Sequence, residues 1–166
     1  MSSYHSATGY VLKTTARNEQ DSVYTLFTRE FGQLELLVKA ARKIDSKLQA
    51  RLQIGDLVLV DFVQGRNQKT LIEAQLLKRP YHIRQDLTKL RVLFEIAALF
   101  DKLVKDELQE RSVWALLQKC FRKLDEPTLD QKQTRLLFFY FVAVLLRELG
   151  YKVPNALLGK IKTLKT

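Results

Sequence analysis

The hydrophobic residues of this chain change their spacing near residue 80, from short β-type runs to a helical repeat. Before that point, β-branched, aromatic and other apolar residues gather in short runs bounded by polar turns, a pattern typical of strands. The pattern predicts five strands, at residues 9–15, 23–27, 33–39, 57–63 and 70–77. Residues 1–8 are expected to form a flexible N-terminal segment.

The second and third predicted strands form a hairpin that turns at Gly32, because glycine readily adopts the positive φ of a bulged turn. After the third strand, Ile44, Leu48 and Leu52 recur at every fourth position, which predicts one or two short helical turns in the connector. Five strands with a partly helical third-to-fourth connection predict an OB-fold barrel. A small SH3-like barrel has the same strand spacing, but the helical connector favours the OB-fold.

Beyond Pro80 the apolar residues recur every three or four positions, which is typical of amphipathic helices. The predicted helices span residues 83–108, 113–124 and 129–149. Thr128 is placed to cap the third helix and Gly150 to end it. We therefore predict a multidomain α+β protein, with an OB-fold β-barrel domain at 1–79 and an all-α helical domain at 80–166.

The chain carries a net charge of +10, from 28 Lys and Arg residues against 18 Asp and Glu residues. Such an excess favours polyanionic partners, and nucleic acid before anionic membranes or acidic proteins. The most hydrophobic run, residues 136–146, is shorter than a membrane span of about 20 residues. The N-terminus has neither the basic region nor the apolar core of a signal peptide. We expect a cytoplasmic protein without a membrane partner.

The sequence contains no phosphate-binding glycine loop, dinucleotide fingerprint, metalloprotease motif or paired-cysteine motif. One cysteine and two histidines leave little material for a disulfide framework or a zinc site. Cys120 falls on the same helical stripe as Leu117 and Leu124, so we expect a buried core thiol rather than a nucleophile. His5 and His82 are expected to be structural or solvent-exposed. We expect no enzyme, no catalytic residue, no metal and no cofactor.

A cluster of positive charge follows the third predicted strand and is opposed only by Asp45. Lys and Arg side chains neutralise phosphates, and each such contact adds affinity that falls as salt rises. The alternative is a solvated connector without a ligand. We predict a DNA-binding set of Lys39, Arg42, Lys43, Lys47 and Arg51, with Arg29 and Lys13 close by.

Three aromatic residues of the hairpin, Tyr24, Phe27 and Phe31, are candidates for stacking on bases. Small barrels need large apolar side chains inside, so we expect Tyr24 and Phe27 to fill the barrel. Phe31 stands at the turn, and we expect it to be the exposed one.

Cations also lie beside apolar positions on the second and third predicted helices. A groove with an apolar floor and a basic rim suits an acidic peptide that ends in a hydrophobic residue. The alternative is a helix with one core face and one solvated face. The predicted partner-tail residues are Arg122, Lys123, Arg135 and Phe139.

Several short blocks occur in a fixed order along the chain. They are GYVLK (9–13), LFTREFGQL (26–34), KAARK (39–43), SKL (46–48), LQIG (52–55), EAQLL (73–77) and LLRELGY (145–151). This ordered series resembles the RecO family of bacterial recombination mediators. The matches are dense through residues 9–77, thinner over 80–140, and dense again near 145.

The resemblance implies an OB-fold followed by a helical domain, and no turnover of a small substrate. Members of this family bind single- and double-stranded DNA and anneal complementary strands. With RecR they load RecA onto DNA that is coated by single-stranded-DNA-binding protein. They recognise the acidic, hydrophobic C-terminal tail of that protein through the helical domain, which implies a cytoplasmic, nucleoid-associated protein.

The chain departs from the family pattern in two places. It ends soon after Gly150 and Tyr151, where many relatives continue with a further helical segment and often a cysteine zinc module, so we expect a short form. Ala40 stands where the family usually has glycine. Two other hypotheses stay open: a protein-interaction adaptor whose helical domain docks a partner tail, and an RNA-binding OB-fold protein.

Overall fold

The computed structural model describes residues 3–39, 52–104, 111–156 and 159. The chain divides into two compact units. The first comprises Met1–Arg79 with Ala97–Gln109, and the second comprises Pro80–Ile96 with Glu110–Thr166. The first unit therefore contains the barrel together with a stretch from the helical half of the sequence.

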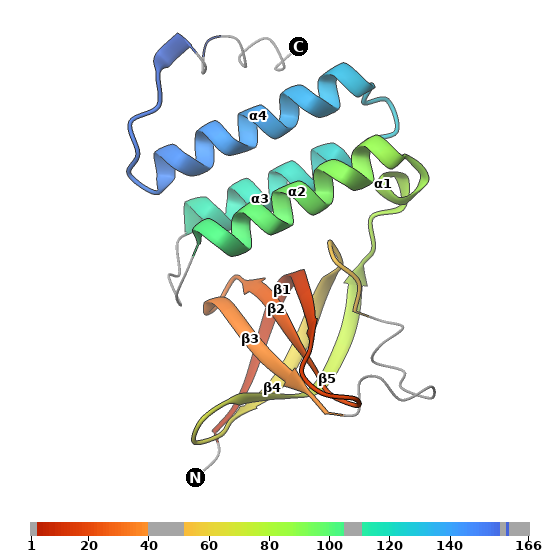
Figure 1. Ribbon diagram of the computed structural model, residues 1–166, viewed down its shortest axis with the longest axis vertical. Helices are drawn as coiled ribbons and strands as arrows, with labels where there is room; N and C mark the ends of the chain where they lie inside the picture. Colours follow the sequence, from red (N-terminus) through yellow and green to blue (C-terminus); the bar gives the residue numbers. More distant parts are fainter. Residues whose placement is uncertain (1–2, 40–51, 105–110, 157–158, 160–166) are drawn as a thin grey trace. The chain divides into compact units, whose positions relative to one another are not determined.

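The strands of the first unit close into a barrel in the order β1-β2-β3-β5-β4 (Figure 1). All neighbouring strands are antiparallel except β3 and β5, which run parallel where Leu36 pairs with Lys69. The strands are β1 (Ser3–Ala16), β2 (Ser22–Thr28), β3 (Gly32–Val38), β4 (Leu57–Gln64) and β5 (Lys69–Lys78). This barrel and the helices that follow it confirm the predicted α+β class with an OB-fold.

Strand β1 begins at Ser3, so the prediction of a flexible segment over residues 1–8 is wrong from Ser3 onward. The first half of β1 pairs with β4 and its second half pairs with β2. His5 is half-buried, stacked on Phe62 with ring centroids 5.4 Å apart and edge-on to Phe31 at 5.6 Å. Backbone pairing and ring packing therefore hold the start of the strand in place.

Gly9 lies where β1 passes from one partner strand to the other. A Cβ atom on this residue would stand 2.8 Å from Thr28 Cγ2 and 2.9 Å from the carbonyl oxygen of Phe27. Only glycine permits β1 and β2 to approach this closely without a shift of the backbone. Gly32 has a φ of 68°, which confirms its predicted place in the hairpin turn.

The barrel interior is filled by side chains from alternate positions of the strands, as small barrels require. Tyr24, Leu26 and Leu34 of the hairpin are buried there, which confirms the interior prediction for Tyr24. Leu52, the last periodic apolar residue of the connector, is buried in the same cluster.

Phe27 is also buried, but against the outside of the barrel. Successive side chains of a strand point to opposite faces, so Phe27 points away from the interior that Leu26 enters. Its ring meets Phe100 of helix α2 (Leu87–Leu103) edge to face, with centroids 4.6 Å apart. The prediction that Phe27 fills the barrel interior is therefore wrong, although the residue is a core residue.

Asp101, the next residue along α2, bridges side chains of β1 and β3 on the outer surface of the barrel. One of its carboxylate oxygens accepts from Lys13 Nζ at 3.2 Å, and the other accepts from Gln33 Nε2 at 3.1 Å. Together with Phe100, these contacts cover part of the outer face of β1, β2 and β3.

In the second unit, the predicted helix at 83–108 is two helices, because α1 (Tyr81–Gln85) stops before Asp86. The Asp86 carboxylate accepts from the backbone N–H groups of Thr88 (2.8 Å) and Lys89 (3.2 Å), so it caps the start of α2. Helix α2 ends at Leu103, earlier than the periodicity predicts.

Helices α3 (Arg111–Leu124) and α4 (Gln131–Glu148) follow. Asp130 caps α4 with a capping box to Gln133, so Thr128 is not the cap that the sequence predicts. Gly150 has a φ of 87° and confirms its predicted role at the helix end. None of the helices in the described parts of the chain is long and apolar enough to span a membrane.

Candidate nucleic-acid interface

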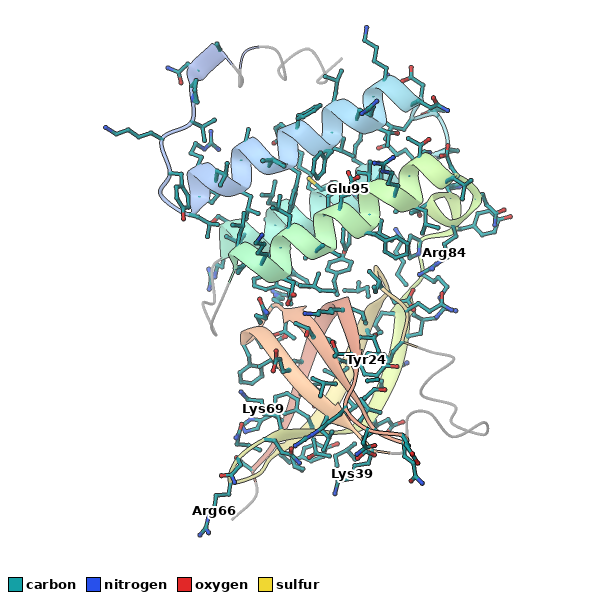
Figure 2. The ribbon with its side chains drawn as sticks, viewed as in Figure 1. Tyr24, Lys39, Arg66, Lys69, Arg84 and Glu95 are labelled. Carbon is teal, nitrogen blue, oxygen red and sulfur yellow. The ribbon has the colours of Figure 1, made fainter. Side chains whose placement is uncertain are left out.

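Four cations gather at one end of the barrel. Figure 2 shows the side chains of Lys39, Arg66 and Lys69 at the lower end of the barrel in that view. Lys39 follows β3, Arg66 stands in the turn between β4 and β5, and Lys69 opens β5. The parallel pairing of β3 with β5 brings these segments together although they are far apart in sequence. We call this region, with Arg17 of the β1–β2 loop, the loop end of the barrel.

The two loops of the loop end are joined and internally bonded. Arg17 donates from Nη1 to Oε1 of Gln68 at 2.6 Å, which ties the β1–β2 loop to the β4–β5 turn. Within the first loop, Asn18 Oδ1 accepts from the backbone N–H groups of Gln20 and Asp21. In the second, the Gly65 N–H donates to the Gln68 carbonyl at 2.9 Å. These bonds link the two loops to each other and close the turn within each loop.

An open hollow of about 370 Å³ lies between these loops and the outer face of the β2–β3 hairpin. Val23 and Leu37, a cross-strand pair, supply its apolar part. Its lining consists of Arg17, Val23, Gln33, Glu35, Leu37, Gln64, Asn67, Gln68 and Lys69. Amides, two cations and one carboxylate thus surround a small apolar patch.

The predicted DNA-binding residues do not all come together. Lys39 is exposed at the loop end, whereas Arg29 is exposed in the β2–β3 turn at the opposite end of the same hairpin. Lys13 is exposed on β1 and pairs with Asp101. Neither Lys13 nor Arg29 therefore belongs to the loop end that contains Lys39. The remaining predicted cations, Arg42, Lys43, Lys47 and Arg51, lie outside the described residues, as does Ala40.

Three cations of the loop end, Arg17, Arg66 and Lys69, are missing from the predicted set. A usable signal existed, because the segments at 16–22 and 64–68 read as turns, and OB-folds bind oligonucleotides through the loops beside the second and third strands. Barrel closure decides which turns meet, and the local pattern of residues carries no information about that closure.

The hairpin aromatics contribute packing rather than an exposed stacking surface. Tyr24 is buried, and burial raises the pKa of its hydroxyl while a hydrogen bond with Thr14 opposes the rise. Phe31 is half-buried, packs on the interior cluster and meets Phe62 edge-on at 5.7 Å. The prediction of an exposed Phe31 is therefore wrong. Among the described residues that line the hollow, none is aromatic.

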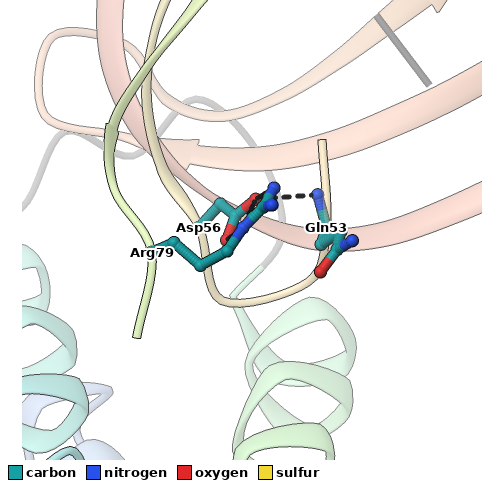
Figure 3. Close-up of polar contacts among 3 residues, drawn as sticks. All are labelled: Gln53, Asp56 and Arg79. Carbon is teal, nitrogen blue, oxygen red and sulfur yellow. Dashed lines mark hydrogen bonds and ion pairs between the residues drawn. The ribbon is translucent and has the colours of Figure 1, made fainter. Parts of the chain in front are cut away.

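An ion pair with a buried carboxylate holds the described end of the third-to-fourth connector (Figure 3). Asp56 has no exposed side-chain surface, and its carboxylate accepts from Arg79 Nη2 at 2.7 Å and Nε at 3.1 Å. It also accepts from the Gln53 N–H at 3.1 Å. The hydrogen bond to Asp56 raises the pKa of Arg79 above its usual value. The pair joins the start of β4 to the chain that follows β5.

The four predicted partner-tail residues lie on α3 and α4. Arg135 and Phe139 are both exposed on α4, and residues four apart lie on one face of a helix. The Phe139 side chain is 53% exposed. Arg122 is exposed on α3, whereas Lys123 donates to Glu126 at 2.7 Å. The structure thus shows an exposed aromatic residue with a cation one turn away.

Cys120 is fully buried on α3, which confirms its predicted place in the core. Burial raises the pKa of its thiol to about 12, so the thiol stays neutral at physiological pH. A neutral, covered thiol is a poor nucleophile.

Known proteins resemble this chain over most of its length. The family profile "Recombination protein O N terminal" matches residues 1–80. The chain is 30% identical over 131 residues to the DNA repair protein RecO of Gloeothece citriformis, an alignment that covers 79% of this chain and 46% of that protein. It is 30% identical over 145 residues to the DNA repair protein RecO of Chloroherpeton thalassium, with 86% and 55% covered. The chain therefore spans about half the length of the curated relatives it matches.

Proposed function

Because the chain belongs to the RecO family, we propose that it acts in DNA repair and recombination by binding DNA at the loop end of the barrel. The observation that carries this proposal is that Arg17, Lys39, Arg66 and Lys69 lie at the same end of the barrel, where Arg17 and Lys69 line a hollow on the β2–β3 face. OB-folds use this face and its adjoining loops for oligonucleotides. We propose that it binds single- and double-stranded DNA.

Binding of this kind supports strand annealing without catalysis. Two complementary strands repel each other through their phosphates, and cations held on one protein surface lower that repulsion. No covalent bond forms or breaks, so we propose a binding protein rather than an enzyme. With RecR, the same activity would assist the loading of RecA onto DNA that carries single-stranded-DNA-binding protein, in the cytoplasm at the nucleoid.

We expect the protein to accelerate the annealing of complementary oligonucleotides, and the acceleration to fade as salt rises. Loss of fluorescence from a dye–quencher pair on the two strands measures the rate, with and without the cognate single-stranded-DNA-binding protein. Another basic protein of similar charge serves as the control, and single-stranded RNA as a competitor tests the RNA-binding alternative. The proposal fails if annealing is no faster than with the control protein at any salt concentration.

We also propose that α4 receives the acidic, hydrophobic C-terminal tail of the single-stranded-DNA-binding protein. The exposed Phe139 offers an apolar anchor and Arg135 a positive charge one turn away. Aromatic anchors and arginines carry much of the energy of such contacts.

Substitution of Phe139 with alanine should weaken the binding of a labelled acidic tail peptide by about 10-fold or more, because it removes the anchor. Fluorescence anisotropy on the full chain measures the affinity. Leu87→Ala is the matched control, since Leu87 is 85% exposed on α2 and its loss should leave peptide affinity unchanged. Equal affinities for the wild type and Phe139→Ala would remove Phe139 from the peptide site.

A further inference from the structure

We propose that the hollow at the loop end receives one unstacked base of a single DNA strand and prefers a base that carries an exocyclic amino group. This inference rests on the proposed function and gives the ligand chemistry of the same region. It goes beyond electrostatic binding, because electrostatic contacts to phosphates do not distinguish one base from another.

The size and floor of the hollow suit a single base. Its volume of about 370 Å³ is near the lower end of the range of about 300 to 1,000 Å³ for small-ligand pockets. Val23 and Leu37 pair across the two strands and provide an apolar surface for the face of a base. A base inside a duplex is stacked on its neighbours, so only a single strand can present one to this surface.

The polar groups around that floor can read the edge of a base. Two of the amides already make hydrogen bonds within the protein. Gln33 Nε2 donates to Asp101, and Gln68 Oε1 accepts from Arg17. Glu35 is exposed on β3 and Asn67 is exposed in the β4–β5 turn, and within the described residues no side chain pairs with either of them. The Glu35 carboxylate only accepts hydrogen bonds, so it favours an amino group on the base. Cytosine carries such a group, whereas the single N3–H donor of thymine stands between two carbonyl oxygens that repel a carboxylate.

The charges around the hollow orient the strand. Glu35 disfavours a phosphate within the hollow, whereas Arg17 and Lys69 attract the backbone to it. A strand that runs past the two cations with one base turned toward Glu35 satisfies both tendencies. Because the described lining contains no aromatic ring, base preference here comes from hydrogen bonds rather than from stacking.

The test compares oligo-dC with oligo-dT of equal length, labelled at one end, by fluorescence anisotropy at one salt concentration near neutral pH. The wild type should bind oligo-dC about 5- to 10-fold more tightly, an effect at the low end of that of a good base-edge contact. Glu35→Ala should reduce the preference to less than about 2-fold while oligo-dT affinity does not fall, which also shows that the variant is folded. Glu73→Ala is the matched control, because Glu73 is an exposed carboxylate of β5 that does not line the hollow.

The outcomes separate the two proposals. Equal binding of oligo-dC and oligo-dT by the wild type, or a preference that Glu35→Ala leaves intact, overturns the base pocket but not DNA binding. Failure to bind either oligonucleotide overturns the proposed function and the pocket together. A preference that Glu73→Ala also abolishes assigns the effect to net charge and overturns the pocket as well.

Discussion

Replacement of Phe100 with alanine is expected to lower the free energy of unfolding of the barrel unit by about 3 to 5 kcal/mol. The Phe100 side chain is fully buried, and it covers Phe27 edge to face at 4.6 Å. Its loss leaves a cavity against the outer face of β2 and removes an aromatic pair. The neighbouring Asp101 also loses the support that positions it between Lys13 and Gln33.

Urea unfolding followed by circular dichroism in the strand region measures this change. Ile72→Ala is the matched control, because Ile72 lies in the same unit, on β5, but is 52% exposed. Its substitution should cost less than about 1 kcal/mol, as expected for a partly solvated side chain. If Phe100→Ala unfolds at the same urea concentration as the wild type, the contact between α2 and the barrel contributes nothing to stability.

The sequence predicted those strands whose residues alternate between apolar and polar, or are apolar throughout, and which lie between clear turns. The hairpin around Gly32 and the strands near 57–63 and 70–77 were found because local residue choice and turn chemistry agree. Strand β1 was found only from Gly9 onward. Its first residues are mostly polar and exposed, and they become a strand because β4 pairs with them, which no local pattern records.

The helices show a similar limit. The apolar period continues across Asp86, so periodicity alone predicts one helix where a carboxylate cap starts a second. For α4 the cap is Asp130 rather than Thr128, because Asp130 has the glutamine three residues later that completes a capping box. Gly150 was predicted correctly, since a positive φ at a helix end depends on glycine itself.

The candidate site was predicted in part. Lys39 was found because it ends a predicted strand beside a charged connector. Arg17, Arg66 and Lys69 were missed because barrel closure brings two separate segments, the β1–β2 loop and the β4–β5 turn, beside the end of β3. The aromatics show the reverse error: Phe31 was expected to be exposed, but it is half-buried and meets the rings of His5 and Phe62 edge-on.

The second large effect concerns the charge of the loop end. Replacing Lys39 and Arg66 with glutamine should weaken single-stranded DNA binding about tenfold at physiological salt, because two phosphate contacts are lost. Both side chains are exposed in the described part of the chain, so the fold should be unaffected. The matched control, Lys78→Gln with Lys102→Gln, removes the same charge from exposed positions of the same unit away from the loop end.

The most direct test of DNA binding at the loop end is the slope of log affinity against log salt for these proteins. The wild type should show a steep negative slope, and Lys39→Gln with Arg66→Gln should reduce its magnitude by about 1.4, or about 0.7 for each single-strand phosphate contact. The slope of the control pair should equal that of the wild type. If both pairs change the slope equally, or neither changes it, DNA is not bound at the loop end.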